Sequence, residues 1–120
     1  MIRFYDGRVS TLDAAELDSA IERAQRLGSH LFNLSNGNGP SEEELAAAPL
    51  ISAWTLGSRP VTCLRGDIYN HPRLAPTTVA RDDITSDLVV IDETLGWART
   101  LSRWYRLGLP LHVGSPRGRA

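Results

Sequence analysis

The pattern of apolar residues changes near the middle of the chain, and this change limits the folds that the chain can adopt. Before residue 50 apolar side chains recur at helical spacing, whereas after it short β-branched runs alternate with clusters of Gly, Pro, Asn and Asp. Helical spacing predicts amphipathic helices, and short runs bounded by turn residues predict strands. We therefore expect an α+β fold, with an N-terminal helix and a short second helix packed on a small antiparallel sheet formed by the C-terminal half.

The first helix is expected to follow a short strand. Ile2 to Tyr5 alternates in polarity, and Asp6-Gly7 suits a tight hairpin turn. Ser10 or Thr11 then caps a helix, whose apolar stripe consists of Leu17, Ala20, Ile21, Ala24 and Leu27. Because Gly28 directly follows the last residue of this stripe, we expect the helix to end there.

Turn residues and a second capping signal come after the first helix. The segment from Asn33 to Pro40 is rich in Asn and Gly, which favour turns, and residues 30–33 have a short strand as one interpretation. Ser41 and Glu44 have the spacing of a capping box. This box predicts a short helix from Glu42 to Ala48.

Strands are expected where β-branched runs stand between turn clusters. The predicted strands are Ile51 to Leu56, Val61 to Tyr69 and Ile84 to Ile91. A chain of 120 residues, 42% hydrophobic and 22% charged, has the length and composition of one globular domain. We therefore expect a single domain over residues 1–113 and a flexible basic tail over 114–120.

The aromatic and basic segment 97–107 has two interpretations. As a helix it places the arginines opposite an apolar stripe, as its periodicity favours. As a strand it places Arg99 and Arg103 on the same side as Trp97 and Tyr105. The choice decides which side chains share a surface.

Several short motifs follow one another from Leu64 onward. They are Leu64-Arg-Gly66, His71-Pro-Arg-Leu74, Thr85-Ser86, Ile91-Asp92 and Gly96-Trp-Ala-Arg-Thr-Leu-Ser-Arg-Trp-Tyr-Arg-Leu-Gly108. In this order they resemble a family of small, mainly alphaproteobacterial proteins of unknown function, and the likeness includes Trp54 and Pro60. The resemblance implies a hairpin that turns at Glu93 to Gly96, with the Thr-Ser pair and the Arg-Thr-x-Ser run on adjacent strands. It implies no activity.

The nucleophile and metal-ligand candidates lack the spacing that catalysis or metal binding needs. Cys63 and His71 would lie about 26 Å apart on a straight strand, so we expect a buried structural cysteine instead. Together with His30 and His112 they show none of the paired spacings of zinc sites. We expect no enzyme activity, no cofactor and no metal.

Paired carboxylates and a glycine-rich loop are further candidates for chemistry. We expect Asp82-Asp83 and Asp92-Glu93 to be solvated turn residues or helix caps, since each pair lies at a predicted turn. The glycines between Asn36 and Gly39 match neither the dinucleotide nor the P-loop pattern. Neither feature predicts a catalytic site.

The C-terminal basic and aromatic segment is the best candidate for a binding surface. Residues 96–120 hold five arginines and no acidic residue, whereas the whole chain has a net charge of −1. The positive field is therefore local. In the alternative interpretation the aromatic residues belong to the core and the arginines pair with carboxylates of the same chain. Those carboxylates would be Asp82, Asp83, Asp87, Asp92 and Glu93.

These features predict a small non-enzymatic interaction protein, a regulator or inhibitor of the kind that mobile elements or phages encode. We expect it to bind a protein partner through Arg99, Arg103, Trp104 and Arg106, because arginine and aromatic side chains dominate protein hot spots. The alternative is nucleic-acid binding by the same surface. A single cysteine and the absence of an apolar run of about eighteen residues predict a cytoplasmic protein without a membrane span.

Overall fold

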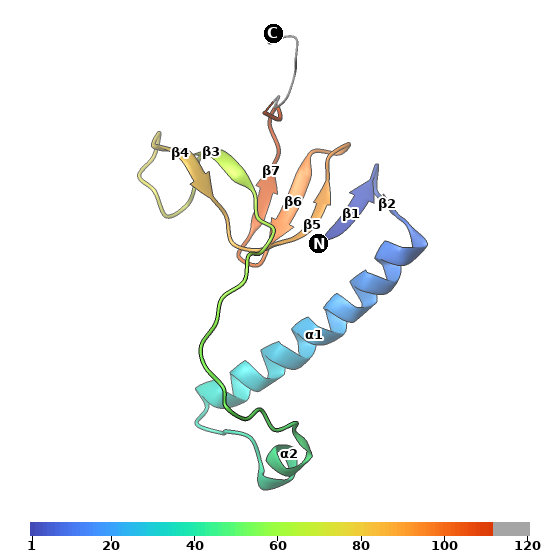
Figure 1. Ribbon diagram of the computed structural model, residues 1–120. Helices are drawn as coiled ribbons and strands as arrows, with labels where there is room; N and C mark the ends of the chain where they lie inside the picture. The colour runs from blue at the N-terminus through green and yellow to red at the C-terminus, as the bar shows by residue number, and fades with distance from the viewer. Residues whose placement is uncertain (112–120) are drawn as a thin grey trace. The chain divides into compact units, whose positions relative to one another are not determined.

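A computed structural model of the protein describes residues 1–111. The chain divides into two compact units, one made of Met1–Ser10 with the chain from Val61 onward, the other of Thr11–Pro60. The described strands belong to the first unit and the helices to the second (Figure 1). The α+β class is confirmed. The packing of the helices on the sheet and the single domain stay predictions, and the tail 114–120 lies outside the described residues.

The helical unit begins with α1 (Thr11–Ser35), which continues well past its predicted end. Gly28 lies inside the helix, because a single interior glycine costs only about 1 kcal/mol relative to alanine. The apolar stripe also continues, through Leu31 and Leu34. The strand interpretation of 30–33 is therefore wrong. The helix ends where Gly37 adopts a φ of +82° and its N–H bonds to the Leu34 carbonyl oxygen.

The second helix, α2 (Glu42–Ala47), starts as the capping box predicts. The Ser41 hydroxyl accepts a hydrogen bond from the Glu44 N–H, and the Glu44 carboxylate accepts one from the Ser41 N–H. The Ser41 N–H also lowers the pKa of Glu44. Residues 51–56, predicted as a strand, form neither helix nor strand. Ala53, within this segment, has a φ of +52°, which a regular strand does not allow.

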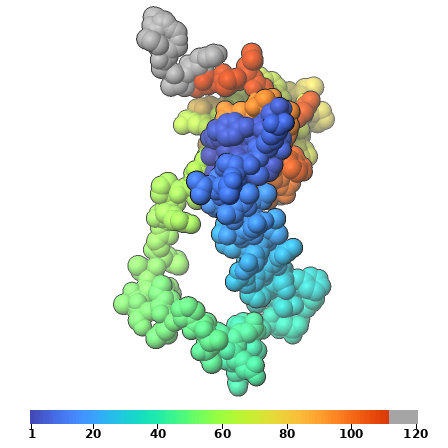
Figure 2. Space-filling view, turned by 90° about the vertical axis from the view of Figure 1, so that its right-hand side faces the viewer, coloured from blue at the N-terminus to red at the C-terminus, as the bar shows by residue number. Residues whose placement is uncertain are grey.

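The larger sheet of the other unit has five strands. They are β1 (Ile2–Tyr5), β2 (Arg8–Val9), β5 (Leu88–Asp92), β6 (Trp97–Thr100) and β7 (Trp104–Arg106). Their order is β2-β1-β5-β6-β7, with β1 parallel to β5 and every other pair antiparallel. The predicted C-terminal antiparallel sheet is thus extended by the N-terminal hairpin. Figure 2 shows the blue atoms of this hairpin against the orange atoms of the C-terminal strands.

A separate two-stranded sheet pairs β3 (Arg65–Tyr69) with β4 (Val79–Ile84). The strand predicted over residues 61–69 therefore starts later, and the one predicted over 84–91 is divided between β4 and β5. Where the predicted strand is divided, the backbone bonds to the chain before β3 instead. Thr85 N–H donates to the Leu64 oxygen at 2.9 Å, and Leu88 N–H donates to the Thr62 oxygen at 2.8 Å. The chain before β3 thus runs beside the segment that joins the two sheets.

Asp6 and Gly7 connect β1 to β2, as the sequence predicts. Their φ values are +51° and +78°, the pair of positive angles that a two-residue hairpin turn of type I′ needs. The nearby Asp92, expected to be a solvated turn residue, is instead fully buried. The prediction fails because its carboxylate serves as an acceptor for the backbone N–H groups of Asp6, Gly7 and Leu95.

The apolar core of the sheet unit is small. Leu88, Ile91 and Ala98 form its buried cluster, and Leu64 and Leu107 pack against it. Because Ala98 is completely buried in the middle of β6, it fixes that strand against the core. The side chains on either side of Ala98 in the sequence therefore face the other way.

Candidate binding surface

The segment 97–107 forms two strands joined by a turn, so its helix interpretation is wrong. The chain is extended, as the strand interpretation predicts, but it is not one continuous strand. The turn predicted between β5 and β6 lies at Glu93 to Gly96, where Gly96 has a φ of +79°. A second turn separates β6 from β7, closed by a bond from Thr100 N–H to the Arg103 oxygen at 3.0 Å.

The register of this hairpin decides which side chains share a face. Trp97 pairs with Arg106 and Arg99 pairs with Trp104, whereas Ala98 pairs with Tyr105. Directly paired residues point to the same side of a sheet. One face therefore carries two tryptophans and two arginines. Tyr105 lies on the opposite face from Arg99, contrary to the expectation from a single strand, because the second turn resets the alternation.

Aromatic rings form a row across this face. The Phe4 and Trp97 ring centroids lie 5.9 Å apart, and those of Trp97 and Trp104 lie 5.6 Å apart with the rings nearly perpendicular. The Arg99 guanidinium lies 5.7 Å from the centre of the Trp104 ring. The separations of all three contacts lie within the range in which aromatic pairs and cation–π pairs attract each other. We call the surface made by Phe4, Trp97, Arg99, Trp104 and Arg106 the arginine–aromatic face.

Exposure differs along the row. Trp97 is half-buried, and Trp104 is 65% exposed although it is a large aromatic residue. An exposed tryptophan on a strand indicates a binding surface more strongly than an exposed leucine does, because aromatic rings of this size are usually covered. Trp104 is therefore the most accessible apolar group of the arginine–aromatic face.

The guanidinium groups of the predicted site have no carboxylate partner within residues 1–111. Arg99, Arg103 and Arg106 make no ion pair there, whereas Asp82 pairs with Arg65 and Glu93 with Arg3. The bidentate bond to Arg65 lowers the pKa of Asp82 and raises that of Arg65. The internal pairing of the three arginines, weighed as an alternative, is therefore not seen in the described part of the chain.

Strand β7 also has a free edge. It is the last strand of the five-stranded sheet, and no strand within residues 1–111 pairs with its outer side. The backbone groups of residues 103 and 107 face β6. Thr100 N–H donates to the Arg103 oxygen, and Leu107 N–H donates to the Gly96 oxygen at 2.9 Å. Because antiparallel partners alternate, the backbone N–H and C=O groups of Trp104 and Arg106 point outward. The open edge and the exposed ring thus belong to the same three residues.

Arg103 does not lie on the arginine–aromatic face. It ends the second turn, where the Thr100 hydroxyl accepts bonds from the N–H groups of Ser102 and Arg103 at 3.2 and 3.3 Å. Its side chain lines a pocket of about 240 Å³ together with Tyr105. The four predicted binding residues therefore divide into two groups, three on the arginine–aromatic face and Arg103 at the pocket.

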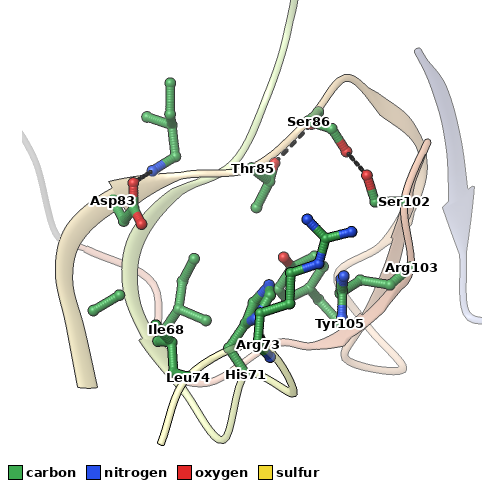
Figure 3. Close-up of a pocket in the computed structure, with 12 residues that line it drawn as sticks. Ile68, His71, Arg73, Leu74, Asp83, Thr85, Ser86, Ser102, Arg103 and Tyr105 are labelled. Carbon is green, nitrogen blue, oxygen red and sulfur yellow. Dashed lines mark hydrogen bonds between the residues drawn. The ribbon is translucent and has the colours of Figure 1, made fainter. Parts of the chain in front are cut away.

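The pocket collects residues that the sequence does not single out for binding. Its lining includes Arg73, Ser86 and Ser102, drawn in Figure 3. The motifs His71-Pro-Arg-Leu74 and Thr85-Ser86 and the turn after Thr100 meet here, with the Ser86 and Ser102 hydroxyl oxygens 2.9 Å apart. The contact brings the two Ser-containing motifs together, but not on adjacent strands as the resemblance implies, because Thr85 and Ser86 lie between β4 and β5 and Ser102 lies in the turn after β6. The sign of this pocket in the sequence is that these motifs occur in one chain, in the order that carries the family resemblance.

The other candidates are placed as follows. Cys63 is half-buried, and His71 lines the pocket while Cys63 does not. No group of three His, Cys, Asp or Glu side chains within residues 1–111 is arranged to hold a metal ion, and His112 lies outside that range. Asp83 accepts a bond from the Ile84 N–H at 2.8 Å. Neither helix of the described chain could cross a membrane.

Comparison with known proteins gives one match. A model of a family of unknown function, DUF6634, matches residues 16–114. No curated protein and no solved structure matches the chain.

Proposed function

The chain belongs to this family of unknown function, DUF6634, and we propose that it is a small non-enzymatic interaction protein that binds a protein partner at the arginine–aromatic face. In this role it acts as a regulator or inhibitor, of the kind that mobile elements or phages encode. We place the interaction in the cytoplasm, where the single cysteine, Cys63, stays reduced.

One observation carries the proposal. Trp104 is 65% exposed, and two arginines without carboxylate partners in the described chain, Arg99 and Arg106, lie on the same face. Tryptophan and arginine are the residues most enriched in binding hot spots, and truncation of such a residue costs about 2 kcal/mol or more. A cluster of this composition on a strand supports a protein interface.

The free edge of β7 indicates the form of the partner. An extended segment of another protein can add to an open strand, with backbone hydrogen bonds giving affinity and side-chain contacts giving specificity. The outward backbone groups of Trp104 and Arg106 offer such bonds, and the two guanidinium groups favour acidic side chains on the incoming strand. We therefore propose an acidic, extended segment as the partner's contact element.

Nucleic-acid binding by the same residues is the rival function, supported by the open Trp104 ring on which a base can stack. The net charge of −1 supplies no global attraction for phosphate backbones. Its own test is a titration with single- and double-stranded oligonucleotides at about 50 mM salt, where phosphate contacts are strongest. Binding that weakens steeply with added salt would favour nucleic acid over protein.

The test of the proposal is a quantitative affinity pull-down from cells that produce the protein, with nuclease present throughout. The variant Arg99→Glu with Arg106→Glu reverses both charges of the arginine–aromatic face. We expect it to lose about tenfold or more of the partner recovered by the wild type. Arg103 is left unchanged, because it lies at the pocket.

The matched control reverses two other exposed arginines, Arg8 and Arg59, which also make no ion pair within residues 1–111. The change in net charge is the same, so a loss of recovery confined to the first variant is specific to the surface. Equal recovery with both variants, with unchanged circular dichroism, would remove the arginine–aromatic face as the binding site.

A further inference from the structure

The pocket beside the turn between β6 and β7 is lined by several hydrogen-bond donors that have no acceptor within residues 1–111. It lies between the loop that joins β3 to β4 and the turn that joins β6 to β7, and its volume is about 240 Å³. Figure 3 shows Arg73 and Arg103 extending toward the same space, below the hydroxyl groups of Ser86 and Ser102. These four side chains come from three separate segments of the chain.

The two guanidinium groups are available for a ligand. Neither Arg73 nor Arg103 makes an ion pair within residues 1–111. Between them they can present two planar forks of N–H donors, the geometry that recognises oxyanions bidentately. The single acidic side chain of the lining, Asp83, has one carboxylate oxygen bonded to the Ile84 N–H. Two positive charges against one negative charge leave the pocket net positive.

Neutral donors add to this set. The Nδ1 atom of His71 accepts a hydrogen bond from the Arg73 N–H at 3.1 Å, so the neutral ring carries its proton on Nε2. The Ser86 and Ser102 hydroxyls are 2.9 Å apart, and the bond between them uses one of their two protons. The other proton remains for a ligand. Thr85 offers none, because its hydroxyl donates to the Ser86 carbonyl oxygen.

The opposite part of the lining is apolar. It consists of Ile68, Leu74, Ala80 and Ile84. A ligand that fills the pocket therefore has an anionic end for the arginines and hydroxyls and a small carbon end for these side chains. A carboxylate has two oxygens, fewer than the donors present, whereas a phosphate monoester has three terminal oxygens and a charge of about −2.

We propose that this pocket binds a small organic phosphate monoester. Arg73 and Arg103 bind its phosphoryl oxygens, the serine pair donates one further hydrogen bond, and the apolar lining contacts the esterified carbon group. Arg103 and Tyr105 lie on the opposite side of the hairpin from Trp104. The pocket is thus separate from the arginine–aromatic face, and failure of either proposal leaves the other standing.

The test is a nuclear magnetic resonance titration of the full chain with three probes, phenyl phosphate, inorganic phosphate and benzoate. We expect saturable amide shifts at His71, Arg73 and Leu74 and at residues 85–86 and 102–105, with phenyl phosphate bound about tenfold more tightly than inorganic phosphate and benzoate weakest. No saturable shift with either phosphate probe would overturn the proposal. Equal affinity for the two phosphates would overturn the monoester and assign free phosphate instead.

Variants then locate the site. The change Arg73→Gln with Arg103→Gln is expected to weaken phenyl phosphate binding about tenfold or more, and the control Arg8→Gln with Arg59→Gln to leave it unchanged. If the first variant does not fold, Arg103→Lys keeps the charge and removes the fork, and is expected to weaken binding about threefold or more. Unchanged binding in a folded variant of either kind would overturn the site.

Discussion

The backbone N–H of Gly7 donates a hydrogen bond of 2.6 Å to the Asp92 carboxylate, 85 residues further along the chain. The same carboxylate accepts from the N–H groups of Asp6 and Leu95. Because Asp92 is fully buried, this one side chain supplies acceptors for two turns, the one between β1 and β2 and the one between β5 and β6. It therefore ties the N-terminal hairpin to the strands that carry the arginine–aromatic face.

The first prediction concerns the stability that this carboxylate provides. Asp92→Asn replaces one carboxylate oxygen by an NH2 group, which cannot accept from the backbone and leaves at least one partly buried N–H group without a partner. We expect the melting temperature to fall by about 5 °C or more, as measured by circular dichroism. The control Asp87→Asn changes a carboxylate for which no hydrogen bond is found among residues 1–111. An equal effect of both changes would contradict this role.

The second prediction is the pH dependence of that stability. Burial raises the pKa of Asp92. The hydrogen bonds from the backbone N–H groups of Leu95, Gly7, Asp6 and Thr94 lower it, and together they outweigh burial, so the pKa lies below the ordinary value of 3.8. The unfolded chain then binds a proton more readily than the folded chain. The contribution of Asp92 is complete above the unfolded pKa and is lost as the pH falls through the folded pKa.

We therefore expect the urea midpoint of the wild type to fall steeply between about pH 5 and pH 2, and that of Asp92→Asn to fall less. The exposed pair of Asp82 with Arg65 acts in the same direction, since the pKa of Asp82 is also lowered. Asp82→Asn is the comparison variant and removes a smaller part of the slope, because exposed ion pairs stabilise little. Parallel pH profiles for the wild type and Asp92→Asn would contradict the account.

The third prediction concerns the turn that positions Arg103. Thr100 is almost completely buried, and its hydroxyl accepts from the N–H groups of Ser102 and Arg103. Thr100→Val keeps the shape and removes the acceptor, so we expect a loss of about 1 to 3 kcal/mol in the free energy of unfolding. Thr100→Ser keeps the hydroxyl and is expected to retain most of that stability. Chemical denaturation measures both, and equal losses would show that the hydroxyl is unimportant.

The fourth prediction tests the charge around the exposed tryptophan. In a Trp54→Phe background, which removes the other strongly exposed indole, iodide is expected to quench fluorescence more than acrylamide does at equal concentration. The reason is that Arg99 and Arg106 attract the anion to Trp104. Arg99→Gln is expected to lower the iodide quenching and leave acrylamide quenching nearly unchanged. A quenching ratio that does not respond to this change would indicate a neutralised surface.

Local signals in the sequence predicted local structure. Asp6-Gly7 predicted a hairpin because few residues accept two positive φ angles in succession, and Ser41 with Glu44 predicted a helix start because the two groups satisfy each other. The helix end predicted at Gly28 is wrong, because the helical preference of the residues on both sides outweighs the small cost of one glycine. Signals of this kind act over a few residues and say little about distant partners.

The arrangement of the candidate site depends on long-range pairing, which the sequence alone does not encode in any short pattern. Asp92 looks like a turn residue until β1 pairs with β5 and brings Gly7 to its carboxylate. Arg103 and Trp104 are neighbours in the sequence, yet adjacent residues of a strand face opposite sides and the turn fixes which side each one takes. The sequence therefore predicts one binding surface, whereas in the structure the four residues divide between the arginine–aromatic face and the pocket.

Site-specific photo-crosslinking at position 104 tests the central claim most directly, because it asks what lies against the exposed ring in the cell. A benzophenone amino acid replaces Trp104 in one variant and the similarly exposed Tyr69 of β3 (61% exposed) in the control. We expect a covalent adduct with one protein species at position 104, abolished by Arg99→Glu with Arg106→Glu and absent at position 69. No adduct at position 104, or the same adducts at both positions, would contradict the assignment of the arginine–aromatic face as the binding surface.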